Sequence, residues 1–362
     1  MKHFIGLDLH SNNTILGMID EKGRKAYKKK LPNDLKIISD AIKPFKNKVE
    51  GIVVESTFNW YWLVDGLMME GYNIHLANPS AIKQYEGLKH TDDYDEAFHL
   101  ANLLRLGILP EGYIYPKEER AIRDLLRKRS MLVRQKTANI LSFENLYSRT
   151  TGLKIKRNEV MKMSPDVLKQ IFEEEHIIFS AQSTISLISY LGKSISEIEK
   201  IVLQAMKLKP EFHMLITMPG IGEILALTIA LETGDITRFK SVGNYASYCR
   251  CVKSIRLSNN KKKGENNRKN GNKYLAWAFM EAAHYAIRGY AEVRRFYQKK
   301  TTSTNRIIAL KATSHKLARA AYFVMKDKVS FAMERAFASE KIKVAAANHS
   351  VGNGHKAIRP DW

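Results

Sequence analysis

Two carboxylates stand at the ends of apolar stretches near the start of the chain. Asp8 interrupts the run MKHFIGLDLH at residues 1–10, and Glu55 follows the run GIVV at residues 51–54. An ionised carboxylate beside a buried strand is costly unless a partner or a metal ion compensates its charge. We therefore expect Asp8 and Glu55 to contribute to a site, and an aspartate that faces solvent at a strand end is the plain alternative.

A third acidic group lies in the stretch HTDDYDEA at residues 90–97, ahead of a helical pattern of apolar residues. Asp92 and Asp95 are three residues apart, so a helix would place both on one face. Close carboxylates repel one another unless a cation lies among them, and Mg²⁺ or Mn²⁺ prefers such oxygen ligands. Two such ions about 4 Å apart can activate a nucleophile and stabilise a leaving oxygen at phosphorus. The alternative is that these acids only favour the helix macrodipole.

A second candidate group lies in a basic stretch rich in Asn and Gly, at residues 256–273. Besides Ser258, it contains cations that suit phosphate binding, namely Lys261, Lys262, Lys263, Arg268, Lys269 and Lys273. Such a composition predicts a phosphate-binding loop. A serine hydroxyl there can act as a nucleophile only if a base or a metal activates it and positive charge stabilises the phosphorane.

The stretch LITMPGIGEILA at residues 215–226 has the signature of a helix-hairpin-helix. Gly220 and Gly222 would allow backbone N–H groups to approach a phosphate at a helix N-terminus. Such hairpins also serve purely as packing elements, so both roles are open.

The whole chain carries a large basic surplus. Its 362 residues have a formal net charge of +22, which favours polyanionic partners such as nucleic acid, although a ribosomal-type protein would show the same balance. The two cysteines, Cys249 and Cys251, are too close for a relaxed disulfide and too few for a zinc site, which fits a reducing cytosol. No apolar run approaches the roughly 18 residues of a membrane span, and the N-terminus has no signal-peptide pattern.

The elements predicted for residues 1–110 alternate in a recognisable order. Three strands are followed by helix, strand, helix and strand, at residues 3–9, 14–20, 24–31, 33–43, 51–56, 59–70 and 73–77. This is the order of a ribonuclease-H-like mixed α/β sheet. Sites in open α/β sheets form at strand ends, which is where Asp8 and Glu55 fall.

The rest of the chain is predicted to be mainly helical. Residues 111–209 contain a heptad seam that suits an intramolecular helix pair or a dimeric coiled coil. Its members are Ile188, Leu191, Ile195, Ile198, Val202 and Ala205. Residues 210–335 form a predicted helical domain that carries the hairpin and the serine loop, and residues 336–362 are predicted to be a flexible tail.

Taken together, the motifs GLDLH, VVES, HTDDYDEA, MPGIGEILA and RLSNNKKKG…RKNGNKYLAWAFMEAA resemble the DEDD transposases of bacterial insertion sequences. More narrowly, they resemble the insertion-sequence one-ten family of bridge-RNA-guided recombinases, over nearly the whole chain. The resemblance implies a RuvC-like catalytic domain, a coiled-coil segment and a C-terminal transposase domain. It places the family's metal-binding tetrad on Asp8, Glu55, Asp92 and Asp95. Asp93 and Glu96 are rivals, because Glu96 intrudes before Ala97 in the family pattern Lys-Thr-Asp-x-x-Asp-Ala.

The resemblance also implies a serine nucleophile. The family's Ser-Gly-Gly-Lys-like stretch here reads Ser258-Asn259-Asn260-Lys261, so Ser258 is the expected nucleophile and Ser254 the fallback. In the implied mechanism, carboxylates bind Mg²⁺ beside the scissile phosphate, and the serine forms a phosphoserine link that conserves bond energy for re-ligation. Family members assemble as dimers and tetramers, and we expect this protein to be in the bacterial cytoplasm, at the nucleoid. A structured guide RNA pairs with donor and target DNA, so that pairing reads sequence while protein reads backbone.

Two other functions are compatible with parts of the sequence. A RuvC-like junction resolvase or nuclease would use the same carboxylates with water as nucleophile, and Ser258 would be a bystander. A non-catalytic DNA- or RNA-binding protein would use its acids only structurally. The basic serine loop and the hairpin favour the recombinase, because a minimal nuclease needs neither.

Overall fold

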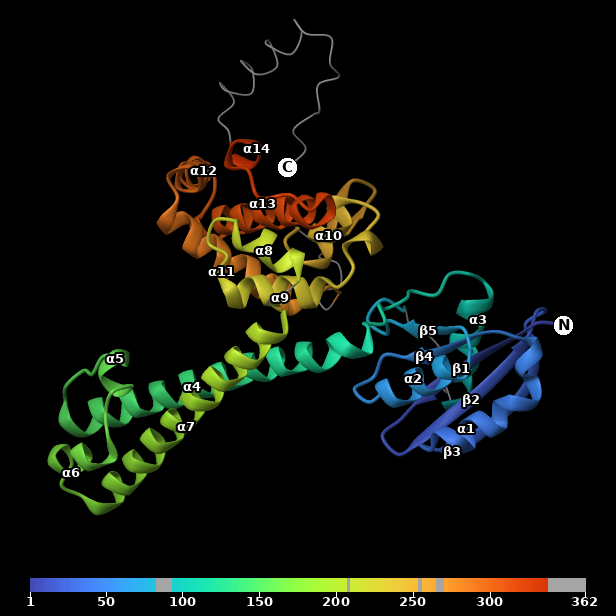
Figure 1. The fold of residues 1–362 in the computed structure, drawn as a ribbon, viewed down its shortest axis with the longest axis horizontal. Helices are drawn as coiled ribbons and strands as arrows, with labels where there is room; N and C mark the ends of the chain where they lie inside the picture. Colours follow the sequence, from blue (N-terminus) through green and yellow to red (C-terminus); the bar gives the residue numbers. More distant parts are fainter. Residues whose placement is uncertain (83–92, 207–208, 253–255, 265–269, 338–362) are drawn as a thin grey trace, which may run out of the picture. The chain divides into compact units, whose positions relative to one another are not determined.

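The computed structural model describes residues 1–82, 93–206, 209–252, 256–264 and 270–337. These residues form two compact units (Figure 1). The N-terminal unit contains Met1–Lys117, and the C-terminal unit contains the described residues of Glu118–Gly264 and those from Gly271 onward.

The N-terminal unit is built on a mixed five-stranded sheet. Its strands are β1 (His3–Leu9), β2 (Asn13–Asp20), β3 (Lys25–Pro32), β4 (Val49–Glu55) and β5 (Ile74–Ala77). They are arranged in the order β3-β2-β1-β4-β5. β1, β2 and β3 pair antiparallel, whereas β4 runs parallel to both β1 and β5. The mixed α/β sheet expected from the sequence is confirmed, and it is consistent with a ribonuclease-H-like domain.

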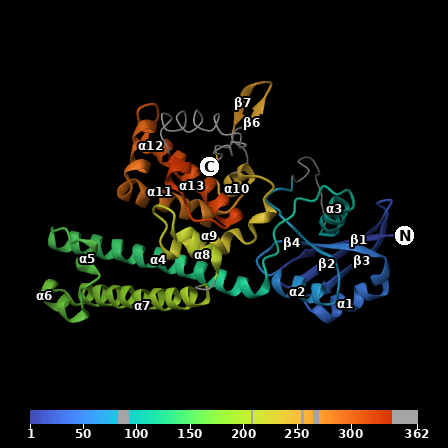
Figure 2. The same cartoon turned by 45° about the horizontal axis from the view of Figure 1, so that its top comes forward.

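Helices cover both faces of this sheet (Figures 1 and 2). On one face, α1 (Leu35–Ile42) and α2 (Tyr61–Met69) pack on a core that includes Ile5, Leu7 and Leu16. A 3-10 turn, Lys43–Lys48, joins α1 to β4. On the other face lies α3 (Asp93–Arg105), which contacts β1, β2 and β4. Because side chains alternate along a strand, Gly6 and Asp8 face α3 while Ile5 and Leu7 face α1 and α2.

Two long helices open the C-terminal unit. They are α4 (Lys117–Thr151) and α7 (Glu175–Met206), and they lie side by side in both views (Figures 1 and 2). Short elements connect them, namely α5 (Arg157–Val160), the 3-10 turn Pro165–Val167 and α6 (Leu168–Ile171). Five of the six predicted seam residues are buried, and Met206 takes the place of the exposed Ala205. The seam is therefore covered within this chain, and its use in a dimer stays a prediction.

The remaining helices form the core of the C-terminal unit. They are α8 (Pro210–Ile216), α9 (Glu223–Thr233), α10 (Val242–Tyr248), α11 (Lys273–Gly289), α12 (Ala291–Thr301), α13 (Arg306–Asp327) and α14 (Met333–Phe337), with a 3-10 turn at Ile236–Arg238. A hairpin of β6 (Arg256–Ser258) and β7 (Lys261–Gly264) precedes α11. Alanines on α11 and α13, such as Ala282 and Ala320, allow close helix packing, and one continuous core also includes Leu126 of α4 and Leu191 of α7. The predicted segments 111–209 and 210–335 thus share a core.

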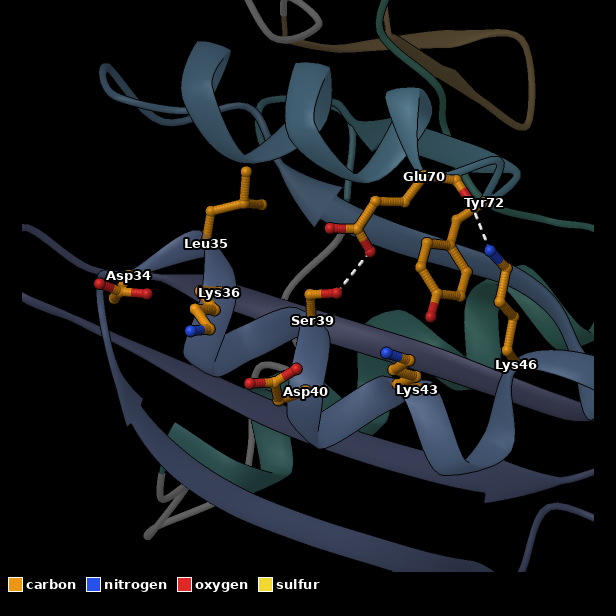
Figure 3. Close-up of a pocket in the computed structure, with 9 residues that line it drawn as sticks. All are labelled: Asp34, Leu35, Lys36, Ser39, Asp40, Lys43, Lys46, Glu70 and Tyr72. Atoms are coloured by element: carbon orange, nitrogen blue, oxygen red, sulfur yellow. Dashed lines mark hydrogen bonds between the residues drawn. The ribbon is translucent and has the colours of Figure 1, made fainter.

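A cavity of about 700 Å³ lies beside α1 and the end of α2. Figure 3 shows that Ser39 and Lys46 are directed toward Glu70, where the Ser39 hydroxyl donates to the carboxylate. The Lys46 ammonium donates to the Glu70 backbone oxygen over 2.6 Å. Neither Asp8 nor Glu55 lines this cavity, so the candidate site lies elsewhere. Among the described helices, none has the length and apolar character required to traverse a membrane.

Candidate active site

The carboxyl ends of β1 and β4 bring Asp8 and Glu55 together. The two strands pair in parallel with Leu7 opposite Val54, so the next residue of each strand stands at the same level. Asp8 is only 3% exposed, whereas Glu55 is half-buried. Strand register thus supplies the first two carboxylates at the sheet edge where sites form in α/β folds.

Helix α3 approaches this part of the sheet closely because two glycines face it. A Cβ atom added at Gly6 would lie 1.9 Å from the backbone oxygen of Ala97. One added at Gly17 would lie 3.0 Å from the backbone nitrogen of Phe98. Gly6 and Gly17 stand opposite one another in β1 and β2. Because neither residue has a side chain, the backbone of α3 can pack directly on the two strands at this point.

The pKa of Glu55 is raised, and its causes identify the neighbours of this carboxyl group. Burial is the largest cause, followed by the negative charges of Asp8 and Glu96, while His10 opposes the shift. Carboxylates that raise one another's pKa are held in the ionised form by a cation among them. Among the described side chains of the HTDDYDEA stretch, Glu96, in the first turn of α3, is therefore the acid that acts on Glu55 electrostatically.

His10 is a residue of this centre to which the sequence patterns assign no role. Its Nε2 atom lies 2.9 Å from Oδ2 of Asp8. The side-chain amides of Asn33 and Asn59 donate to the His10 backbone oxygen over 3.0 and 3.1 Å. His10 is thereby fixed from two sides, and its ring contacts the buried carboxylate. The motif GLDLH contains it, so an imidazole two residues after the aspartate was the available signal.

The structure directs Asp95 toward the β3 edge of the sheet, away from Glu55 at the end of β4. The exposed Asp95 lies with Oδ1 3.1 Å from Nζ of Lys25 on β3. In the sheet order, β3 and β4 lie on opposite sides of β1. Asp92 lies outside the described residues, as do the contacts of the Asp93 side chain. Of the predicted tetrad, the structure therefore brings Asp8 and Glu55 together and does not bring Asp95 to them.

The described residues contain no ready-made group of three or more His, Cys, Asp or Glu side chains arranged around a metal position. The donor chemistry nevertheless fits a divalent cation. Asp8 and Glu55 offer carboxylate oxygens in partly desolvated positions, and their mutual charge already raises the pKa of Glu55. Such hard oxygen donors suit Mg²⁺ or Mn²⁺.

Ser258 ends the first strand of the β6–β7 hairpin, which is labelled in Figure 2. Ser258 is opposite Lys261, so the turn consists of Asn259 and Asn260. Both asparagines have positive φ, at 50° and 57°, as a two-residue type I′ turn requires. Asparagine is the residue other than glycine that best tolerates this conformation. Asn-Asn can therefore replace Gly-Gly here, and Ser254 lies outside the described residues.

The predicted basic residues divide into two sets. Lys261 and Lys263 on β7 and Lys273 at the start of α11 are exposed. Arg268 and Lys269 lie outside the described residues, as does the environment of the Lys262 side chain. The expected long loop thus contains a hairpin over residues 256–264, because its turn residues favour strand pairing even though lysines are poor strand formers.

The two glycines of the predicted helix-hairpin-helix have different surroundings. Gly220, at φ 76°, packs against α11, and a Cβ atom there would lie 2.2 Å from the backbone oxygen of Ala282. Gly222 is exposed, and nothing lies within 4 Å of a Cβ atom built on it. This contact favours the packing role for Gly220, while a phosphate contact at Gly222 stays a prediction.

Two protein-family models match this chain, one in its N-terminal part and one in its C-terminal part. A DEDD-type family model of the IS110 transposases, described as "Transposase", matches residues 5–150. A second model, described as "Transposase IS116/IS110/IS902 family", matches residues 212–298. The search of curated proteins gives no match. The chain belongs to the IS110 family of transposases.

Proposed function

We propose that this transposase cuts and rejoins DNA strands through a phosphoserine intermediate at Ser258, next to a divalent metal bound by carboxylates. The observation that carries the metal part is the position of Asp8 and Glu55 at the adjacent ends of β1 and β4, where the charge of Glu96 also raises the pKa of Glu55. The position of Ser258 at a hairpin turn with a left-handed Asn-Asn pair supports the serine part.

Asp8 and Glu55 would hold the metal, and Glu96 takes the place expected for Asp95. Asp92 stays in the proposed set, and Asp93 is its rival because it precedes Glu96 by three residues. When bound, Mg²⁺ supplies Lewis-acid stabilisation of charge on the phosphate oxygens. His10 keeps the buried Asp8 carboxylate in place through their 2.9 Å contact.

The serine step is a substitution at phosphorus. The Ser258 oxygen loses its proton and forms a bond to the scissile phosphorus, while the bond from phosphorus to one deoxyribose oxygen breaks and that oxygen is protonated. The new phosphodiester keeps the bond energy, so the reverse attack by another deoxyribose hydroxyl can join two strands. Lys261 and Lys263 on the same hairpin are suitable partners for the phosphorane charge.

The charge of the chain supports a nucleic-acid complex larger than the active site. A net charge of +22 favours binding to DNA and to a structured RNA through their backbones. We propose a guide RNA that pairs with donor and target DNA, and a dimer or tetramer in which one subunit's serine can act beside another's carboxylates. The proposed location is the bacterial cytoplasm, at the nucleoid.

Trapping of covalent protein–DNA adducts tests this function. With donor DNA, guide RNA and Mg²⁺, the wild type should form adducts that survive denaturant, and both Ser258→Ala and Asp8→Asn should form none. Strand cleavage without adducts in the wild type would instead indicate a nuclease that uses water. Binding without any metal-dependent cleavage would indicate a non-catalytic nucleic-acid-binding protein.

A further inference from the structure

Glu232 is a buried acid that the proposed chemistry does not use. It lies near the end of α9 and is 1% exposed. The Arg127 guanidinium on α4 donates to both of its carboxylate oxygens, over 2.5 and 2.7 Å. Nε of Arg123 lies 3.6 Å away. Burial alone would lower the pKa of Arg127, but the hydrogen bonds and charge of Glu232 raise it above its ordinary value.

The same carboxylate also contacts the start of α11. The side-chain amide of Asn272 donates to Oε2 of Glu232 over 2.7 Å. The Asn272 side-chain oxygen in turn accepts from the backbone N–H groups of Tyr274 and Leu275, over 2.8 and 3.1 Å. Asn272 is therefore the N-cap of α11 and also a hydrogen-bond donor to the buried Glu232 carboxylate.

Asn272 also closes the chain segment that carries Ser258. Its backbone N–H donates to the Tyr248 backbone oxygen over 2.6 Å. The Arg250 guanidinium donates to the Gly271 backbone oxygen over 3.0 Å. Gly271 has φ 85°, and a Cβ atom there would lie 2.6 Å from the Tyr248 oxygen. The two ends of residues 249–271 thus meet beside Glu232, and the hairpin lies between them in sequence.

We propose that Glu232, Arg127 and Asn272 form a positioning clamp that fixes the base of the serine-bearing segment, an inference that rests on the proposed role of Ser258. One carboxylate ties α4, α9 and the first turn of α11 together. A buried ion pair contributes little net stability compared with an apolar replacement, and its best-attested use is to specify one arrangement. The clamp would therefore act on the rate of serine transfer more than on stability or DNA affinity.

Asn272→Ser is the sharpest variant. Serine keeps the N-cap of α11, because its hydroxyl oxygen can accept from the same backbone N–H groups. It removes the amide that donates to Glu232 over 2.7 Å and, more weakly, to the Tyr248 hydroxyl over 3.5 Å. A matched control is Glu199→Gln, because Oε1 of Glu199 accepts from Nε of Arg129 over 2.7 Å and joins α4 to α7 away from the serine segment.

The experiment measures three quantities for each variant: the rate of covalent adduct formation at saturating DNA, the DNA concentration at half saturation, and the midpoint of thermal unfolding. For Asn272→Ser we expect an adduct rate lower by about tenfold or more, since small misplacements of a reacting group have large effects on rate. Half-saturation should change by less than about twofold and folding should persist. Glu199→Gln should keep the wild-type adduct rate.

Each outcome has a distinct meaning. If the wild type forms adducts that depend on Ser258 and Asn272→Ser forms them at the same rate, the clamp is overturned while the serine mechanism stands. If the loss matches a loss of DNA affinity or of folded protein, Asn272 has only a structural role and the clamp is again overturned. If the wild type forms no adduct, or Ser258→Ala keeps it, the proposed function fails and the clamp fails with it. Asn272→Asp, which keeps the cap and adds a second carboxylate beside Glu232, should lower the rate further.

Discussion

The carboxylate centre and the serine hairpin are built in opposite ways. Asp8 is buried at the end of a central strand and faces α3. This helix packs closely on the sheet because Gly6 and Gly17 have no side chains. Ser258 stands at the end of a two-stranded hairpin that is closed by a two-residue turn. A strand in the middle of a sheet fixes a side chain tightly, whereas an isolated hairpin is at most marginally stable. The comparison indicates a rigid position for the proposed metal site in one unit and a hairpin arm for the proposed nucleophile in the other.

The largest expected effect is a difference in metal-dependent cleavage between variants of two neighbouring acids of α3, Glu96 and Asp95. Glu96→Gln removes a carboxylate that acts on Glu55, so metal-dependent strand cleavage should fall by about 100-fold or more. Asp95→Asn is the matched control, because Asp95 pairs with Lys25 on the edge strand. It should change cleavage by less than about threefold, because an exposed ion pair contributes little. Cleavage rates as a function of Mg²⁺ concentration make the measurement, and a large loss in Asp95→Asn with none in Glu96→Gln would restore Asp95 to the tetrad.

Substitution of Gly6 tests how firmly α3 is held against the sheet that carries Asp8 and Glu55. Gly6→Ala places a methyl group 1.9 Å from the Ala97 backbone oxygen, so α3 must shift, and overpacking of this kind costs about 1–3 kcal/mol. Thermal unfolding should show the loss of stability, and metal-dependent cleavage should fall in the protein that remains folded. Gly112→Ala is the control, because its nearest neighbour is at an ordinary 3.5 Å. Equal behaviour of the two variants would show that α3 is not held by this contact.

Substitutions in the turn of the serine hairpin test whether this turn positions Ser258. Replacing Asn259 and Asn260 together by glycine should leave adduct formation within about twofold of the wild type, because glycine adopts positive φ without strain. Replacing both by alanine should lower it several-fold, since the turn then costs about 1–2 kcal/mol per residue. Rates of adduct formation at saturating DNA decide the matter. Indifference to alanine would mean that the type I′ turn does not position Ser258.

The smallest effect concerns Cys249 and Cys251, which precede the serine hairpin in the sequence. Burial raises the pKa of the Cys251 thiol to about 11, and burial also raises that of Cys249. Because a raised pKa keeps a thiol protonated below that value, both cysteines should resist iodoacetamide at pH 8 in the folded protein and react after unfolding. Mass spectrometry of the alkylated peptides measures this. Rapid labelling of the native protein would show that the segment before the hairpin is open.

Much of the first region could be predicted from the sequence because strand ends and turn residues leave a local signal. The positions of Asp8 and Glu55 follow from two apolar strands that each end near an acid. The choice between Asp95 and Glu96 could not be made, since the rotation of α3 depends on a contact between Ala97 and Gly6 that is distant in sequence.

In the second region the local signal was weaker. Lysine and asparagine are poor strand formers, so residues 256–264 read as a loop, and the paired turn appears only when both strands are present. Glu232 was not predicted to matter, because a single acid in an apolar helix gives no indication that Arg127 and Asn272 meet it across 105 and 40 residues of chain.

Identification of the residue that becomes attached to DNA is the most direct test of the proposed role of Ser258. Wild-type protein is incubated with donor DNA, guide RNA and Mg²⁺, denatured, digested with nuclease and protease, and analysed by tandem mass spectrometry. We expect a nucleotide phosphate on the peptide that contains Ser258, located at that serine. A phosphate on another residue, or cleaved DNA with no modified peptide, would contradict it.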